Sequence, residues 1–229
     1  MKIAVITLVG SADDYEPLRE AGHELIFGPA RSQAVTRLTQ DELVEAAGDA
    51  DCLIYNVITP TILAALPKLK LAITHYVGYD KIDSKAAAAR NVMVCNVPDY
   101  GTTEVADHAL ALALSLRRGI ALRLEAQRRP QPAPWRYVSD PLLRRNGVQT
   151  FGIVGLGRIG TAAALRAKAF QFRVVVYDPY MPNGTELGVG VERVTSLEAL
   201  MEQTDTLSIH APLTLETRGM ISRAMLERM

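Results

Sequence analysis

Cysteine is scarce in this sequence, with only Cys52 and Cys95 among 229 residues. Both lie inside apolar runs that are typical of β-strands, and free cysteine behaves as a small, buried apolar side chain. We therefore expect two buried thiols in a reducing cytoplasm, in preference to a disulfide or a pair of metal ligands. No other pattern in the sequence predicts a metal site.

An excess of charge is also lacking, because 25 lysines and arginines balance 25 aspartates and glutamates. Proteins that bind nucleic acid usually carry clustered basic residues, so a nucleic-acid partner is not expected. No apolar run approaches the roughly 18 residues that cross a membrane, and no cleavable signal sequence follows Met1. We expect a cytoplasmic protein without a membrane partner.

Short apolar runs alternate with helix-like segments along the whole sequence. Strands are predicted at 2–8, 23–28, 51–57, 70–76, 92–97, 150–155, 172–177 and 206–210. Helices are predicted at 39–50, 59–66, 83–90, 158–169 and 196–203. Thr39 is the expected N-cap of the first of these helices, and Thr195 with Glu198 forms an expected capping box at the last. This alternation predicts an α/β fold whose parallel sheets are covered on both faces.

The segment 102–129 differs from the rest because leucines alternate with small residues over 109–116, as they would in a strand. The run is too long for a strand, and leucine and alanine are strong helix formers. We predict one long helix with Thr102 or Thr103 as its N-cap. It is apolar almost all round, so we expect it to be buried between two domains or two subunits.

A proline-rich segment follows this helix. Four prolines between Pro130 and Pro141 predict a loop. Trp135, the only tryptophan, lies within it. Two interpretations stay open for Trp135, a packing anchor and a subunit contact.

The pattern G-x-G-x-x-G at Gly155, Gly157 and Gly160 lies between a predicted strand and a predicted helix. The first glycine permits a tight turn, the second lets a pyrophosphate approach the backbone, and the third lets helix and strand pack closely. Asp178 ends the next apolar run, about 20 residues later. A carboxylate there accepts hydrogen bonds from an adenosine ribose and repels a 2′-phosphate, so NAD is predicted in preference to NADP. The alternative is a glycine turn that binds nothing.

Two further features lie where predicted strands end. Gly78 follows the strand 70–76, and the amides of Val77 and Gly78 could hold a carboxylate, although an ordinary turn is an equally good interpretation. His210 ends the strand 206–210. A packed or hydrogen-bonded histidine is favoured there over an acid or base.

Together these segments resemble the D-isomer-specific 2-hydroxyacid dehydrogenases, in particular the branch of the C-terminal-binding proteins and phosphoglycerate dehydrogenases. The matching segments are "VGYDKID", "CNVPDYGTTEVADHALAL", "GIVGLGRIG", "ALRAKAF", "VVVYDPY" and "HAPLTLETRGMI". They occur in the family's order and at its spacing, over roughly residues 50–229.

The resemblance implies a flavodoxin-like substrate domain, residues 1–100, and a Rossmann-type NAD-binding domain, residues 101–229. It implies hydride transfer between NAD(H) and a 2-oxo or 2-hydroxy acid, and a homodimer formed through helix 102–124. The amides of Val77 and Gly78 would bind the substrate carboxylate. The cofactor-binding residues that it implies are Val105, Gly155, Gly157, Arg158, Ile159, Gly160, Asp178, His210, Ala211, Pro212, Thr214 and Thr217.

The chain departs from the family pattern at three places. Tyr76 stands where the family usually has a glycine, and its side chain would crowd the carboxylate pocket. Gln171 replaces a glycine that would end helix 158–169, which should cost stability. The family pattern continues beyond residue 229 with a catalytic Arg, a Glu and a His.

Because this part of the pattern is missing, we expect an NAD-binding domain that is incomplete at its C-terminus, with strand 206–210 as an open sheet edge. We also expect no catalytic residue in this truncated chain. Little or no turnover is then expected. The alternative function is a non-catalytic, NAD-sensing and dimerising interaction module that resembles a corepressor.

Overall fold

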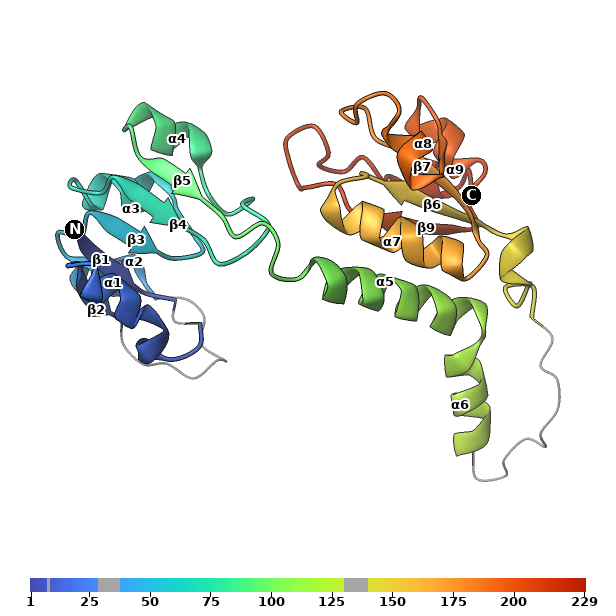
Figure 1. Cartoon of the computed structure of the whole chain (residues 1–229), viewed down its shortest axis with the longest axis horizontal. Helices are drawn as coiled ribbons and strands as arrows, with labels where there is room; N and C mark the ends of the chain where they lie inside the picture. The colour runs from blue at the N-terminus through green and yellow to red at the C-terminus, as the bar shows by residue number, and fades with distance from the viewer. Residues whose placement is uncertain (8, 29–37, 130–139) are drawn as a thin grey trace. The chain divides into compact units, whose positions relative to one another are not determined.

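The computed structural model describes residues 1–7, 9–28, 38–129 and 140–229, which form two compact units, Met1–Tyr100 and Gly101–Met229 (Figure 1). Each unit has its own parallel sheet, so the predicted α/β class is confirmed. Trp135 and most of the proline-rich segment lie outside the described residues. Within the described part, no helix is long and apolar enough to span a membrane.

Among its described residues, the first unit contains five strands in the order β2-β1-β3-β4-β5, which is the flavodoxin-like order. The strands are β1 (Lys2–Val5), β2 (Glu24–Phe27), β3 (Cys52–Ile54), β4 (Leu71–Ile73) and β5 (Met93–Cys95). The helices are the 3₁₀ turn η1 (Ala12–Tyr15), α1 (Glu16–Glu20), α2 (Gln40–Ala47), α3 (Pro60–Ala65) and α4 (Ser84–Ala89). Successive side chains alternate between two apolar clusters, one on each face of the sheet.

The two cysteines differ in environment, which corrects the expectation that both are buried. Cys52 is buried and Cys95 is exposed, and both are free thiols. Burial raises the pKa of the Cys52 thiol to about 11. Cys95 lies on the edge strand β5, on the face of the sheet opposite to Val94. Helix α1 covers that face, but it packs near β2 at the other edge of the sheet. The side chain of Cys95 is therefore left exposed.

The part of the second unit that the structure describes contains four strands in the order β8-β7-β6-β9. The strands are β6 (Thr150–Val154), β7 (Arg173–Tyr177), β8 (Glu192–Arg193) and β9 (Thr206–Ile209). The helices are α5 (Thr102–Arg117), α6 (Ile120–Arg128), the 3₁₀ turn η2 (Asn146–Val148), α7 (Arg158–Ala169), α8 (Thr185–Val189), α9 (Leu197–Met201) and α10 (Arg223–Leu226). The strand order reverses between β6 and β9. In the described part of the chain β9 pairs with β6 alone, as expected of an edge strand.

Small side chains let α5 and α7 pack closely on one face of this sheet, with α9 on the other (Figure 1). Ala106 and Leu110 of α5 join Ala163 and Ala167 of α7 in one buried cluster. The buried end of α5 is tied to the start of β9, because Arg117 Nε donates to Thr206 Oγ1 at 2.6 Å.

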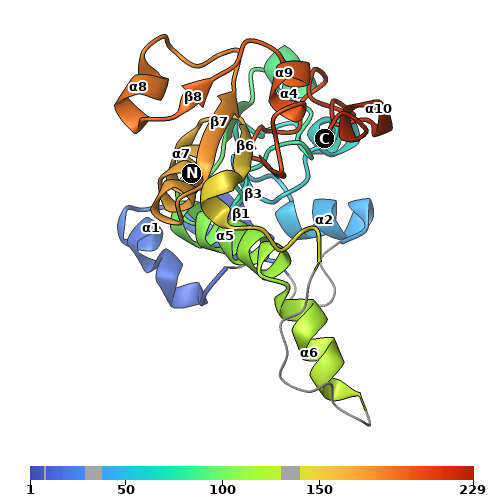
Figure 2. The same ribbon diagram turned by 90° about the vertical axis from the view of Figure 1, so that its right-hand side faces the viewer.

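The prediction of one long helix over 102–124 is wrong. The helix breaks at Gly119, which adopts a left-handed φ of +61°, and α6 leaves the end of α5 in a new direction (Figures 1 and 2). The N-cap is Gly101 rather than Thr102 or Thr103. The apolar side chains do not all become buried in the single chain either, since Leu112 is 60% exposed and Leu116 52%.

The two predicted helix caps had different outcomes. Thr39 caps α2 as predicted: its hydroxyl accepts from the Glu42 amide at 3.3 Å, and the Glu42 carboxylate accepts from the Thr39 amide at 2.8 Å. The prediction for Thr195 is wrong by one residue, because Ser196 Oγ caps α9 by accepting from the Ala199 amide at 3.1 Å. Thr195 and Ser196 both carry a hydroxyl group that could cap a helix. Because α9 begins at Leu197, Ser196 occupies the N-cap position.

Gln171 adopts the left-handed conformation that the glycine of the family pattern would favour, with a φ of +66°. Its amide donates to Lys168 O at 2.8 Å and the Phe172 amide to Ala167 O at 3.1 Å, which together close a Schellman motif at the end of α7. Asn91 repeats this motif after α4, with a φ of +55°. Asparagine tolerates this conformation better than glutamine does.

We predict that Gln171→Gly raises the free energy of unfolding by about 0.5–1 kcal/mol, because relief of the left-handed strain exceeds the entropy that glycine loses on folding. Urea unfolding followed by circular dichroism measures the change. The matched variant Asn91→Gly should gain less. A lower stability of Gln171→Gly than of the parent protein would contradict this explanation.

Candidate functional site

The glycine loop that follows β6 lies at the point where the strand order reverses. The Gly155 amide donates to Tyr177 O of β7 at 2.9 Å, and a Cβ on Gly155 would lie 2.9 Å from the Ala211 amide nitrogen, just past β9. The loop is thus held between the ends of both neighbouring strands. Gly155 has a φ of +88°, so its conformation and its close contacts both exclude a side chain. In open α/β sheets this edge is where ligands bind.

The other two glycines of the loop differ in what surrounds them. A Cβ on Gly160 would lie 2.0 Å from Gly155 O, so this glycine is required for α7 to pack on the loop. A Cβ on Gly157 would meet nothing within 4 Å, so the backbone there is open on one side. Gly157 is also the N-cap of α7, without a side-chain cap for the first amides of the helix. These amides and the positive end of the helix dipole fit the pyrophosphate of a dinucleotide.

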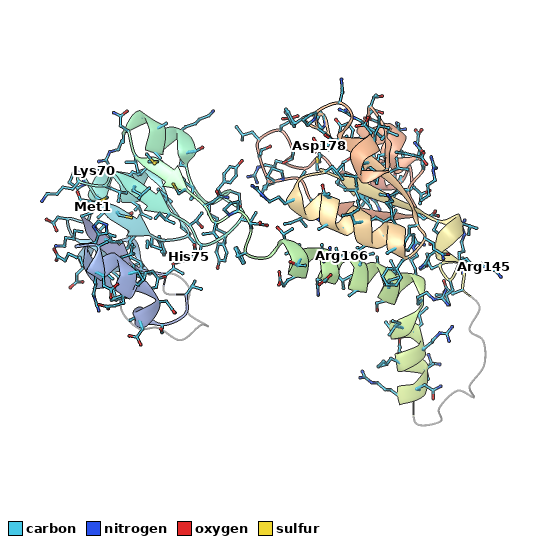
Figure 3. The ribbon with its side chains drawn as sticks, in the orientation of Figure 1. Met1, Lys70, His75, Arg145, Arg166 and Asp178 are labelled. Atoms are coloured by element: carbon cyan, nitrogen blue, oxygen red, sulfur yellow. The ribbon has the colours of Figure 1, made fainter. Side chains whose placement is uncertain are left out.

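Asp178 lies directly after β7, beside the glycine loop. Its Oδ2 accepts from the Leu156 amide at 2.9 Å and its Oδ1 from the Tyr180 amide at 2.9 Å. Each carboxylate oxygen can accept a further hydrogen bond, as a ribose with two hydroxyl groups requires. Figure 3 shows Asp178 at the end of this sheet opposite to Arg145, which precedes β6.

His210 directly follows β9, on the other side of the glycine loop. Its amide donates to Val154 O at 2.8 Å, and its Nε2 lies 2.9 Å from Ser208 Oγ. Burial lowers the pKa of His210, which favours the neutral imidazole. This is the hydrogen-bonded histidine that the sequence favoured.

The loop after β9 is ordered by two threonines. The Thr214 amide donates to Thr217 Oγ1 at 2.8 Å and the Thr217 amide to Thr214 Oγ1 at 3.2 Å. Thr217 Oγ1 donates to Pro212 O at 2.6 Å. These contacts fix the backbone next to Ala211, which lies against Gly155.

One contact at this edge has no signal in the sequence. The Tyr180 hydroxyl donates to the Glu216 carboxylate, which joins the loops after β7 and β9 on either side of the glycine loop. This hydrogen bond raises the pKa of Tyr180. The two residues belong to separate loops, so their spacing could not predict that they meet.

The remaining predicted cofactor residues lie near the starts of two helices. Arg158 and Ile159 begin α7, and Val105 lies in the first turn of α5, where it is 46% exposed. The structure brings the glycine loop, Asp178 and the start of the loop after β9 together, whereas Val105 lies on α5.

In the first unit, the predicted carboxylate loop follows β4. The Tyr76 amide donates to Thr74 Oγ1 at 3.3 Å, and Asn96 Nδ2 donates to Val77 O at 2.8 Å. The Tyr76 side chain is 47% exposed rather than packed into the core. Gly78 is also exposed.

Asparagine side chains from neighbouring strand ends fix this loop, which the sequence analysis missed. Asn56 follows β3, and its Oδ1 accepts from Thr74 Oγ1 at 3.0 Å and from the His75 amide at 3.1 Å. Asn96 directly follows β5. The sequence offered a signal, because both asparagines lie near the carboxyl ends of the predicted strands 51–57 and 92–97.

His75 is half-buried in the same loop. Its Nε2 lies 3.2 Å from the Tyr15 hydroxyl, and burial lowers its pKa. Among the described residues, no group of three or more His, Cys, Asp or Glu side chains is arranged so that it could hold a metal ion.

Comparison with known proteins gives a consistent result. Residues 110–229 match the model of the NAD-binding domain of D-isomer specific 2-hydroxyacid dehydrogenases. A glyoxylate reductase of Korarchaeum cryptofilum is 38% identical over 193 residues, which are 82% of this chain and 57% of the relative. A D-3-phosphoglycerate dehydrogenase of Methanocaldococcus jannaschii is 32% identical over 217 residues, which are 93% of this chain and 41% of the relative. The chain thus spans about half the length of these curated relatives.

Two solved structures agree with the fold. The D-lactate dehydrogenase of Aquifex aeolicus, complexed with NAD and lactic acid, gives a TM-score of 0.77 at 26% identity, over 100% of this chain and 66% of that one. An acyclic imino acid reductase in complex with NADPH and D-Arg gives a TM-score of 0.81 at 25% identity, over 100% of this chain and 71% of that one.

We predict that the loop glycines respond differently to substitution by alanine. Gly160→Ala should lower the free energy of unfolding by about 2 kcal/mol, because its Cβ would overlap a backbone oxygen. Gly157→Ala should change it by less than about 0.5 kcal/mol, because its Cβ faces open space. Thermal unfolding of both variants measures the difference, and equal losses of stability would contradict the loop geometry described above.

Proposed function

Because the chain belongs to the D-isomer specific 2-hydroxyacid dehydrogenase family, we propose that residues 101–229 form its NAD-binding domain and residues 1–100 its substrate domain. One observation carries the proposal. A backbone open at Gly157 and the uncapped start of α7 lie beside the fixed carboxylate of Asp178. This arrangement suits a pyrophosphate and an adenosine ribose at the same edge of the sheet.

Each predicted residue has a role in this proposal. The α7 amides, at Arg158 and Ile159, bind the pyrophosphate. Asp178 accepts hydrogen bonds from the ribose and disfavours a 2′-phosphate. The residues that line the rest of the cofactor site are Val105, His210, Ala211, Pro212, Thr214 and Thr217. When bound, the nicotinamide exchanges a hydride with the carbon that bears the oxo or hydroxyl group of the substrate.

The substrate of the proposed reaction is a 2-oxo or 2-hydroxy acid. The amides of Val77 and Gly78 bind its carboxylate, and the bond from Asn96 to Val77 O supports this loop. Tyr76 has a side chain where the family pattern has glycine, so we propose that it restricts the space beside the carboxylate.

We further propose that these 229 residues bind the cofactor but turn over substrate slowly. In the resemblance, the catalytic Arg, Glu and His come after the part of the pattern that this chain matches. Loss of a positioned acid typically lowers a rate by about 10²–10⁴-fold.

The test is a titration of the 229-residue protein with NADH, followed by NADH fluorescence, with glyoxylate, pyruvate and hydroxypyruvate then added to the saturated protein. We expect saturable binding that Gly157→Ala weakens, and oxidation of NADH far below the usual enzyme rates of about 1–10³ s⁻¹. Absence of binding would refute the cofactor site. Turnover at ordinary rates would refute the assignment of catalysis to residues outside this chain.

The second candidate function is a non-catalytic module that senses NAD and forms dimers. The observation that favours it is the exposed apolar surface of α5 and α6. Leu112, Leu116 and Ile120 are 60%, 52% and 48% exposed, respectively. Exposed apolar side chains on two successive helices are typical of a protein interface, and a second copy of the chain would cover them.

We predict that Leu112→Asp shifts the protein from dimer to monomer in sedimentation velocity, because a carboxylate would be desolvated in the interface. Leu187→Asp, on the 77%-exposed position of α8, is the matched control and should leave the dimer intact. NADH should favour the dimer if the sensing function is right. A parent protein that stays monomeric at all concentrations would contradict the proposed dimer.

A further inference from the structure

The loop after β7 is fixed to the glycine loop through one carboxylate. Asp178 accepts from the Leu156 amide of the glycine loop and, through its other oxygen, from the Tyr180 amide, both at 2.9 Å. The carboxylate that the proposed function assigns to the ribose therefore also sets the position of Tyr180.

The loop after β9 carries Glu216 between two threonines that hold each other. The Thr214 amide donates to Thr217 Oγ1 at 2.8 Å and the Thr217 amide to Thr214 Oγ1 at 3.2 Å, so the backbone is held on both sides of Glu216. At the start of this loop, the Ala211 amide nitrogen would lie 2.9 Å from a Cβ on Gly155. The loops after β7 and β9 are thus both anchored to the glycine loop.

The hydrogen bond from the Tyr180 hydroxyl to the Glu216 carboxylate joins these two loops. It completes a closed ring of contacts, which runs from the glycine loop through Asp178 and Tyr180 to Glu216 and returns through Ala211. Tyr180 is 76% exposed and Glu216 is also exposed, so water competes for both groups. The hydrogen bonds of Asp178 in this ring are half-buried or local in sequence, so the bond between Tyr180 and Glu216 is where the ring opens.

We propose that the hydrogen bond between Tyr180 and Glu216 is a latch, which must open for the adenosine half of the dinucleotide to enter or leave the site. The inference rests on the proposed binding of NAD at the glycine loop. Asp178 binds the adenosine ribose in that proposal and also holds Tyr180, so the adenosine lies beside the latch. The bond raises the pKa of Tyr180, so the hydroxyl keeps its proton at neutral pH and remains a donor.

A latch and an ordinary binding contact differ in their kinetics. A latch that closes over both the empty and the occupied site slows association and dissociation by the same factor, which is the fraction of time that it is open. A residue that only contacts the cofactor changes mainly the dissociation rate, and with it the affinity. The latch therefore sets how fast the cofactor exchanges rather than how tightly it binds.

The experiment is stopped-flow mixing of the full 229-residue chain with NADH, followed by NADH fluorescence. We expect Tyr180→Phe to raise the association and dissociation rate constants together by about three- to tenfold, the equivalent of one net hydrogen bond. The Kd should change by less than about twofold, because both rates rise by the same factor. Phenylalanine keeps the aromatic ring, so a faster rate cannot come from lost apolar contacts of Tyr180.

A second variant, in the other loop, protects the test against misfolding. Glu216→Ala removes the acceptor and should raise both rate constants as Tyr180→Phe does. The double variant should be no faster than either single variant, because both substitutions remove the same bond. The matched control is Glu227→Ala, which removes an exposed carboxylate that pairs with Arg223 outside the ring and should leave both rate constants unchanged.

The outcomes separate the latch from the proposed function. Unchanged rate constants in folded Tyr180→Phe and Glu216→Ala, or faster dissociation without faster association, would overturn the latch while leaving NADH binding intact. Failure of the parent protein to bind NADH would instead overturn the proposed function, and the latch with it.

Discussion

The contact between the backbone of Gly160 and that of Gly155 is the constraint on which the second unit depends. It lets α7 lie directly on the loop that leaves β6, with no side chain between them. The start of α7 is thereby fixed at the sheet edge, and its small residues are brought against α5. A wider separation would move the first amides of α7 away from Asp178. The same close packing that stabilises the fold thus creates the site, so neither can change alone.

Both units build their candidate sites in a similar way. In each, polar side chains that follow parallel strands bond to the backbone of a loop at the carboxyl edge of the sheet. Asn56 and Asn96 do this in the first unit, and Asp178 and Thr217 do it in the second. Loops held by side-chain bonds rather than by packing keep their amides available for anions, which suits a carboxylate in one case and a pyrophosphate in the other.

The sequence predicted the features that depend on local pattern. The positions of the strands other than β8, the extent of α7 and the cap at Thr39 follow from periodicity and from the properties of single residues. The failures have tertiary causes. Gly119 breaks the long helix where the chain must turn, and Cys95 is exposed because the helix on its face packs at the other edge of the sheet. The contact between Tyr180 and Glu216 arises where separate loops meet, which spacing does not encode.

The bond between Arg117 and Thr206 links two residues that are 89 positions apart, at the end of the first helix of the second unit and at the start of β9. Such a contact forms late, because a long loop must close before it contributes any free energy. Once formed, it leaves a buried guanidinium that would lose its partner if either end detached. The second unit should therefore lose its first helix and its last strand together, as a single cooperative folding unit rather than by fraying from one end.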